Sequence, residues 1–222
     1  SETQLSIPIF SFIYVLALED YVRHSKDTTL IYEVYDNVRT MLNAYIREIR
    51  NGLIPMLKCW NFFEWSDGLH NGHQISDWQA DENLFSLPTN CFFIAALESF
   101  VYLSEQIGMD AEKYKPLISE VSKAAHERFF DGNLHLYYTY SDKDKNYHLC
   151  EYTQVVALYA GLGGSYADEI IETITSDGLK GLQPMTLSSY IYKYEVLLRR
   201  GGYRDYIVRD VNTVWGRMAD EG

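Results

Sequence analysis

Apolar residues follow the chain in two patterns that alternate. Four segments are apolar almost all the way round, which predicts helices that are buried on most sides. These segments are Ile9 to Leu18 and Cys91 to Leu103, and Thr153 to Leu162 and Leu187 to Leu198 follow the same pattern more weakly. Four others place apolar residues at steps of three and four with charges opposite, which predicts amphipathic helices. They lie in 29–50, 117–129, 170–174 and 207–218, each after one apolar segment.

Glycines lie near the proposed helix ends, where the left-handed backbone conformation that often ends a helix is favourable for glycine. They are Gly52, Gly108, Gly132, Gly161, Gly178 and Gly201. A repeated pair of inner and outer helices describes an all-α fold, the (α/α) toroid. No sequence repeat accompanies it, so the repetition is architectural. About four helix pairs are predicted, which makes the toroid incomplete as a six-hairpin ring.

Two stretches do not follow a helical pattern. Residues 131–148 predict a small β-hairpin, with a turn-like "SDKDKN" between two short strands. The segment 53–86 is long and holds Trp60, Trp65 and Trp78, and loops of this length in compact domains are commonly functional. We expect one domain over residues 1–222, and the abrupt first and last residues suggest a piece of a longer protein.

The charge balance narrows the classes of partner. The chain has 19 Lys and Arg residues and 31 Asp and Glu residues, so its net charge is −12. This negative charge disfavours nucleic acid and anionic membranes as partners. The three cysteines, Cys59, Cys91 and Cys150, have no metal-site spacing and are predicted to be free, buried thiols. No nucleotide-binding, nucleophile-elbow or zinc-protease motif is present, and no cofactor is expected.

The segment "WNFFEWSDGLHNGHQISDWQADEN" sets flat rings beside carboxylates, amides and histidines. Sugars present apolar CH faces and hydroxyl groups, so this composition suits a carbohydrate cleft at one end of the toroid. The alternative is a folded loop whose tryptophans only fill the rim of the helical ring. Residue types alone do not separate the two.

Two carboxylates of this segment could serve as an acid and base pair. Glu64 lies between Phe63 and Trp65, an apolar setting typical of a general acid, and Asp67 follows three residues later. Glycoside hydrolysis needs two carboxylates, but this spacing arises easily by chance. His70 and His73 are better explained as hydrogen-bonding residues than as metal ligands, so no metal site is predicted.

Gln154 and Tyr190 lie near the starts of two inner helices. If those starts face the rim that carries the tryptophans, both side chains point toward the cleft. Ordinary packing at a helix terminus is the alternative.

Several segments, in order along nearly the whole chain, resemble the catalytic domain of bacterial α-L-rhamnosidases. They are "IPIFSFIYVLALEDYVRHSKD", "WNFFEWSDGL", "CEYTQVVALYAGL", "TLSSYIYKYEVLLRRGG" and "VNTVWGRMADEG". The resemblance implies a six-hairpin (α/α)6 toroid and an inverting glycoside hydrolase for terminal α-L-rhamnosides. The sequence does not identify the compartment, and we expect a soluble protein of the bacterial cytoplasm, the periplasm or the exterior.

The resemblance further implies that the general acid precedes the segment at Ile7 and that the general base follows Gly222. We therefore expect the isolated chain to be inactive and to contribute sugar contacts through Trp60, Glu64, Trp65, Asp67, His70, Gln154 and Tyr190. For Glu64, the resemblance favours a contact or loop-positioning role over that of an acid. Two rivals remain: another toroid glycosidase or polysaccharide lyase that uses Glu64 and Asp67, and a non-enzymatic carbohydrate-binding helical module.

Overall fold

The computed structural model describes residues 7–69 and 81–220. Over these residues the chain forms eight α-helices and two small antiparallel sheets. The helices are α1 (Pro8–Ser25), α2 (Thr29–Glu48), α3 (Leu87–Gln106), α4 (Tyr114–Phe129), α5 (Glu151–Tyr159), α6 (Ala167–Thr175), α7 (Tyr190–Arg200) and α8 (Arg204–Asp220). Pro8 and Pro88 stand in the first turns of α1 and α3, where the missing N–H costs no helical hydrogen bond.

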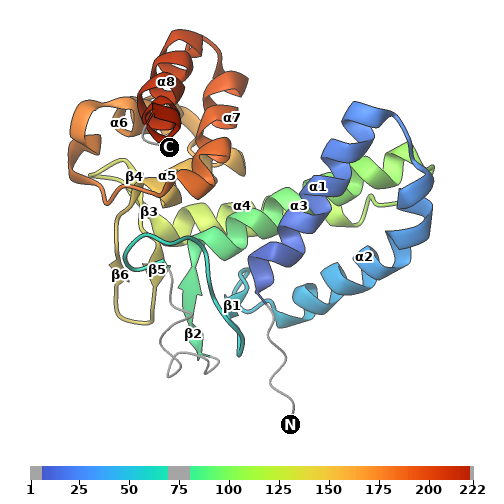
Figure 1. Cartoon of the computed structure of the whole chain (residues 1–222). Helices are drawn as coiled ribbons and strands as arrows, with labels where there is room; N and C mark the ends of the chain where they lie inside the picture. The colour runs from blue at the N-terminus through green and yellow to red at the C-terminus, as the bar shows by residue number, and fades with distance from the viewer. Residues whose placement is uncertain (1–6, 70–80, 221–222) are drawn as a thin grey trace.

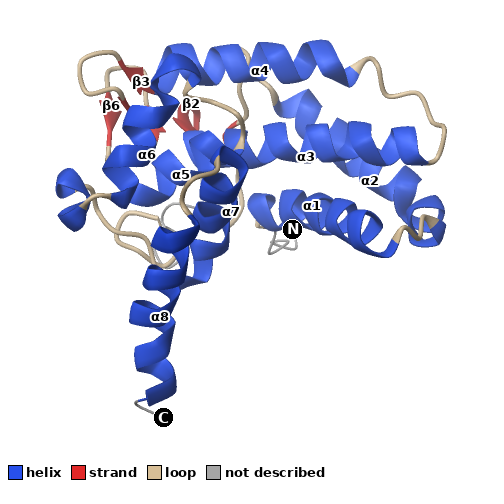
Figure 2. Cartoon of the chain, turned by 90° about the horizontal axis from the view of Figure 1, so that it is seen from above, coloured by secondary structure: helices blue, strands red, loops and turns tan. Residues whose placement is uncertain are grey.

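The helices form an arc of four pairs. In the inner row α1 packs on α3, α3 on α5 and α5 on α7, and each inner helix also packs on the outer helix that follows it. Figure 1 shows this succession from α1 and α2 at one end to α7 and α8 at the other. Figure 2 shows α8 projecting from the body toward the C-terminus. The alternation of apolar and amphipathic segments therefore predicted the helices and their pairing correctly.

The inner helices differ in how far they are buried. Sixteen residues of α3 are buried, and seven of the nine residues of α5 are buried. The expectation of burial on most sides is wrong for α1 and α7. Phe10, Tyr14 and Tyr21 on α1 and Ile191 and Leu198 on α7 are exposed. Since α1 and α7 end the inner row, each has an inner neighbour on one side only.

Helix α3 is long and apolar enough to cross a membrane by length and composition. In this fold 89% of its apolar window is buried inside the protein, against α1, α4 and α5. The apolar character of α3 is therefore explained by its place at the centre of the arc.

The strands lie between the helices as short connections. They are β1 (Pro55–Met56), β2 (Asp81–Ser86), β3 (Phe130–Asp131), β4 (Leu136–Tyr137), β5 (Tyr140–Ser141) and β6 (Asn146–Tyr147). One sheet has the order β1-β2-β5-β6, and β3 pairs with β4 in the other. The predicted hairpin in 131–148 is thus two successive hairpins, and the long 53–86 segment adds β1 and β2.

The four-stranded sheet lies at the N-terminal ends of α3 and α5, because β2 runs directly into α3 and β6 precedes α5 by three residues. The N–H of Leu87, the first residue of α3, donates to the Thr139 carbonyl at 2.9 Å. Asn90, one turn further on, is buried and exchanges hydrogen bonds with both backbone groups of Ile54. These contacts hold the start of the long 53–86 segment against the first turn of α3.

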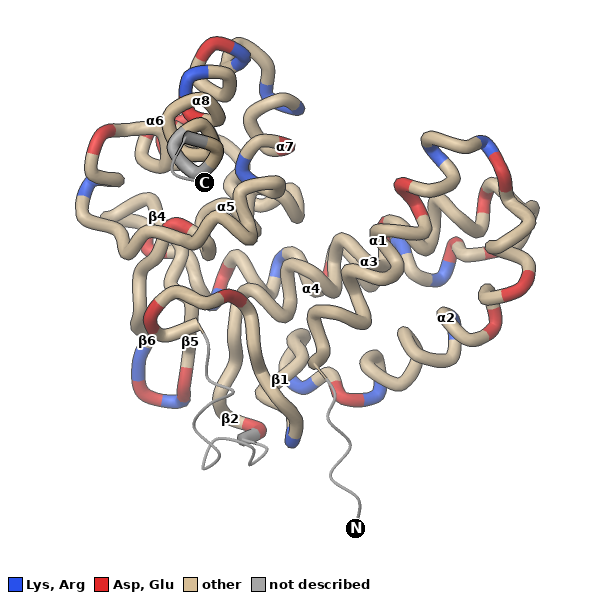
Figure 3. Tube along the Cα trace, viewed as in Figure 1, with Lys and Arg blue, Asp and Glu red and all other residues tan. Residues whose placement is uncertain are grey.

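A large hydrophobic core runs through α1 to α6, and a smaller cluster of Ile171, Val196 and Leu197 joins α6 to α7. Figure 3 shows acidic and basic residues interspersed along the described helices and turns. The prediction for the thiols is confirmed, since Cys59, Cys91 and Cys150 are free and buried.

Candidate functional site

An aromatic cluster lies at the end of the arc where the inner helices begin. Its members are Phe10 on α1 and Trp60, Phe62 and Trp65 in the loop after β1, and we call these four residues the rim cluster. The ring of Phe62 is 4.7 Å from that of Trp65, 5.5 Å from that of Trp60 and 6.1 Å from that of Phe10. Trp65 is 54% exposed, so one large flat ring is available to solvent on a packed aromatic base.

Glu64 holds the loop that carries Trp65. Its side chain is fully buried, one carboxylate oxygen accepts the N–H of Ser66 and the other accepts the N–H of Thr186. Thr186 immediately precedes the short helix η5 (Leu187–Ser189), which leads into α7. The carboxylate therefore ties the loop 57–69, which we call the rim loop, to the start of the fourth inner helix.

Asp67 and Gly68 form the turn that follows, and the hairpin before α5 holds this turn in place. The imidazole Nε2–H of His148 donates to the Asp67 carbonyl at 3.1 Å, and the Tyr140 hydroxyl donates to the Gly68 carbonyl at 2.6 Å. Gly68 has φ +80°, and a Cβ there would lie 2.6 Å from His148 Nε2. The turn therefore requires glycine, both for its backbone conformation and for the close approach of the ring.

His148 is oriented by its second nitrogen, Nδ1, which lies 2.8 Å from the Thr139 hydroxyl. Since Nε2 carries the proton donated to Asp67, Nδ1 accepts from Thr139 in the neutral ring. Burial lowers the pKa of His148, and the hydrogen bond to the Asp67 carbonyl opposes this effect in part. The neutral ring is therefore favoured at this contact.

Asp67 itself is exposed, so its carboxylate is open to solvent. Glu64, in contrast, offers no exposed oxygen, because both are engaged by backbone N–H groups. The geometry gives these two carboxylates different environments, and it gives Glu64 a positioning role. A catalytic pairing of the two stays a prediction.

Gln154 and Tyr190, both predicted to point toward the cleft, lie in different environments. Gln154 is fully buried in α5, where its side-chain oxygen accepts the N–H of Tyr137 and its NH₂ donates to the Tyr137 and Cys150 carbonyls. Its amide thus anchors β4 on α5. Tyr190 opens α7 and lines a cavity formed with α8. Contact of either residue with a ligand stays a prediction, and His70 lies outside the described residues.

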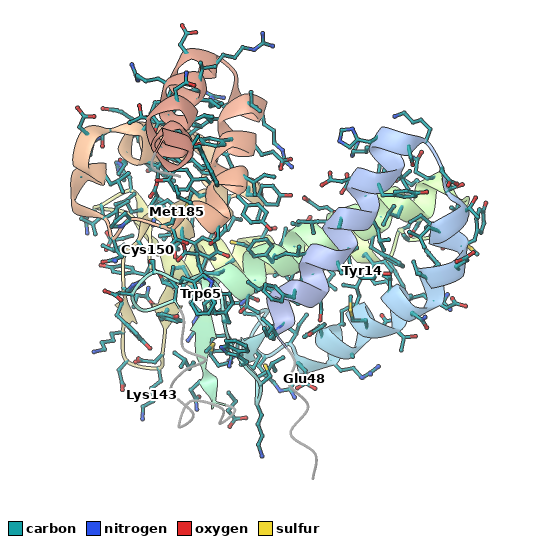
Figure 4. The ribbon with its side chains drawn as sticks, viewed as in Figure 1. Tyr14, Glu48, Trp65, Lys143, Cys150 and Met185 are labelled. Atoms are coloured by element: carbon teal, nitrogen blue, oxygen red, sulfur yellow. The ribbon has the colours of Figure 1, made fainter. Side chains whose placement is uncertain are left out.

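Two buried carboxylates secure the same short segment before α7. Glu151, the first residue of α5, accepts the N–H of Met185 at 3.1 Å, next to the Thr186 N–H that Glu64 accepts. Glu151 is also paired with Lys193 of α7 at 2.7 Å, and both side chains are buried. Sequence reasoning missed this pair. The signal for it was a single lysine in the apolar run "LSSYIYKYEVLL". Figure 4 shows Met185 and Cys150 above Trp65.

Among the described residues, no group of three or more His, Cys, Asp or Glu side chains is arranged to hold a metal ion. A separate hollow of about 490 Å³ opens on the inner row of helices, lined by residues of α1, α3, α5 and α7. Its lining begins at the middle of α1 and α3 and continues toward the C-terminal ends of the inner helices, so it lies away from the rim cluster.

The fold and site define a mostly helical protein, an arc of helix pairs with a built aromatic rim. This arrangement matches part of solved rhamnosidase structures. One is a crystal structure of a family GH78 rhamnosidase of Bacillus sp. GL1, with a TM-score of 0.82 and 18% identity over 97% of this chain. Another is a rhamnosidase from Klebsiella oxytoca with rhamnose bound, with a TM-score of 0.75 and 19% identity over 97% of this chain.

The chain spans only 22% and 39% of the lengths of those two proteins. No protein-family model matches the sequence, and no curated protein matches it. The likeness confirms the sequence resemblance at the level of the fold, and a likeness at this identity shows the fold alone.

Proposed function

We propose that this chain is the central helical part of a glycoside hydrolase domain of the α-L-rhamnosidase type. Its role there is to provide the inner-helix scaffold and an aromatic sugar-binding surface at the rim. The observation that carries the proposal is the rim cluster, in which the exposed ring of Trp65 is fixed where the inner helices begin. The likeness to two rhamnosidase structures over 97% of the chain supports it.

The rim loop is held to three of the four inner helices at their N-terminal ends. Phe62 contacts Phe10 of α1, Glu64 binds the segment before α7, and His148 and Tyr140 bind the turn from the hairpin before α5. Because these anchors come from separate elements, Trp65 is held in a defined position before a ligand arrives. Preorganisation of this kind lowers the entropy lost on binding.

The four helix pairs of this chain would form part of an (α/α)6 toroid. Further hairpins of the complete enzyme would close the ring. A carboxylic acid would protonate the glycosidic oxygen, and a carboxylate across the sugar would activate water for an inverting displacement. We assign neither role to Glu64, because both of its oxygens are used by backbone N–H groups. The isolated chain is therefore expected to bind sugar at the rim without turnover.

The direct test is a titration of the ¹⁵N-labelled chain with L-rhamnose, with the indole N–H signal of Trp65 as the reporter. The proposal predicts a saturable shift of this signal, and binding at the rim that is lost in Trp65→Ala. In a longer polypeptide that includes this chain, Trp65→Ala should raise KM for an aryl α-L-rhamnoside. An indole signal that does not move, together with an unchanged KM, would refute the proposal.

A further inference from the structure

A second cavity lies between α7, α8 and the end of α6. Its volume is about 460 Å³, within the range typical of small-molecule sites. The walls come from the segment after α6, from the first turn of α7 and from the middle of α8, and the first residue of α5 contributes to the lining. None of the four residues of the rim cluster lines it.

The buried pair of Glu151 and Lys193 belongs to this cavity. The Lys193 ammonium is 2.7 Å from the Glu151 carboxylate, and their side chains are 3% and 1% exposed. Burial alone lowers the pKa of Lys193, but attraction to Glu151 and the hydrogen bond to it outweigh this effect and raise it. The ammonium is therefore charged and fixed, and it has three N–H donors on one nitrogen.

Two tyrosine rings flank the ammonium. Lys193 Nζ lies 5.4 Å from the ring centre of Tyr190 and 5.4 Å from that of Tyr206, within the range of cation–π attraction. The cavity thus combines aromatic faces with a buried donor. Thr175, Ser176 and Thr213 add hydroxyl groups to the lining. Each hydroxyl donates its proton to a backbone carbonyl of its own segment, so it offers a ligand only acceptor lone pairs.

The charges around the cavity nearly cancel. The lining contains the carboxylates of Glu151, Asp177 and Asp210 and the cations of Lys193 and Arg209, which leaves an excess of one negative charge. This balance disfavours phosphate and other anions. A neutral molecule with many hydroxyl groups and a CH face matches the donors, acceptors and rings that are present.

The wall after α6 has an unusual backbone. In the turn η4 (Asp177–Gly181), Gly178, Leu179 and Lys180 all have positive φ values, of 69°, 52° and 49°. Left-handed conformations are unfavourable for Leu and Lys, and such strain concentrates at functional sites. Leu179 from this turn lines the cavity.

We propose that the cavity between α7, α8 and η4 is a second binding site, for a neutral monosaccharide unit, built on the Glu151–Lys193 pair and the rings of Tyr190 and Tyr206. It goes beyond the proposed function of the rim and does not depend on it. Tyr190 would then contact sugar in this cavity, apart from the rim cluster.

The test is a titration of the full chain with L-rhamnose, followed by NMR at the methyl groups of Leu179. The site predicts a saturable shift of these methyl signals that persists in Trp65→Ala. The variant Thr213→Trp fills the cavity from an exposed helix position and should weaken this binding at least tenfold. Thr40→Trp makes the same change at an exposed position of α2 and should leave it intact.

Each result has one meaning. Leu179 signals that do not move, or that move equally in Thr213→Trp, would overturn the second site, whatever the Trp65 indole signal does. A saturable Leu179 shift with inorganic phosphate in place of the sugar would overturn the neutral ligand class. A Leu179 shift with a silent Trp65 indole would support this site and count against sugar binding at the rim.

Discussion

Replacement of Glu64 by glutamine tests the positioning role of this carboxylate. The wild-type side chain is fully buried and accepts two backbone N–H groups, one on each oxygen. Glutamine keeps the shape but turns one acceptor into an NH₂ donor. One of the two N–H groups, that of Ser66 or that of Thr186, then faces another donor.

The expected loss of stability follows from the two hydrogen bonds that Glu64 accepts. A hydrogen bond to a charged group contributes about 1.5–3 kcal/mol, and a buried donor left unsatisfied costs about 1–3 kcal/mol. These terms overlap, so Glu64→Gln should lower the free energy of unfolding by about 2–4 kcal/mol. For a domain of this size the melting temperature should fall by roughly 5–15 °C.

The assay is urea denaturation followed by circular dichroism, with Glu120→Gln as the control. Glu120 is an exposed carboxylate on α4, where the same change should stay within about 0.5 kcal/mol of the wild type. If Glu64→Gln is no more destabilising than Glu120→Gln, then the Glu64 carboxylate does not hold the rim loop.

Four further predictions rest on other contacts. Lys193→Met leaves the buried Glu151 carboxylate unpaired and should cost about 3–5 kcal/mol in urea denaturation. Adding Glu151→Gln should restore most of this stability, and a lack of recovery would contradict the pairing. Burial raises the pKa of Cys59 to about 12, so at pH 8 its thiol should react with a disulfide reagent only after unfolding. Burial lowers the pKa of His148, so its contribution to stability is complete above its unfolded pKa of about 6.5 and declines below it. His148→Gln should remove that part of the pH dependence in thermal unfolding, and an unchanged profile would argue against it. The exposed apolar face of α1 should promote self-association, which Phe10→Ser should reduce in sedimentation velocity.

Much of the helical fold could be predicted from local pattern. The apolar run at Cys91 to Leu103 and the stripe in 29–50 both form helices of the predicted kind. A helix that is buried on all sides has apolar residues all round, whereas a helix that is buried on one face has them only at steps of three and four. The exposed faces of α1 and α7 could not be predicted in this way. An apolar face indicates that packing against another helix would be favourable. Whether another helix is there depends on the position in the inner row, and α1 and α7 stand at its two ends.

The place of the aromatic cluster could be predicted from the sequence, and its contact with sugar stays a prediction. The density of aromatic residues between Cys59 and Leu69 identified the rim, and the structure gathers Trp60, Phe62 and Trp65 there. The partners of Glu64 could not be found from sequence, since Thr186 lies 122 positions away. Gln154 shows the same limit. Its burial against β4 depends on how the two hairpins fold back onto α5.

We propose that this chain presents a sugar-facing rim and that Glu64 does not act there as a catalytic acid. The most direct measurement is the release of p-nitrophenol from an aryl α-L-rhamnoside by the chain as it stands, with Glu64→Gln beside it. We expect no release above the uncatalysed rate for either protein, while L-rhamnose still shifts the Trp65 indole signal of the wild-type chain. Turnover by the wild-type chain that disappears in Glu64→Gln, with the variant still folded, would contradict it and make Glu64 catalytic.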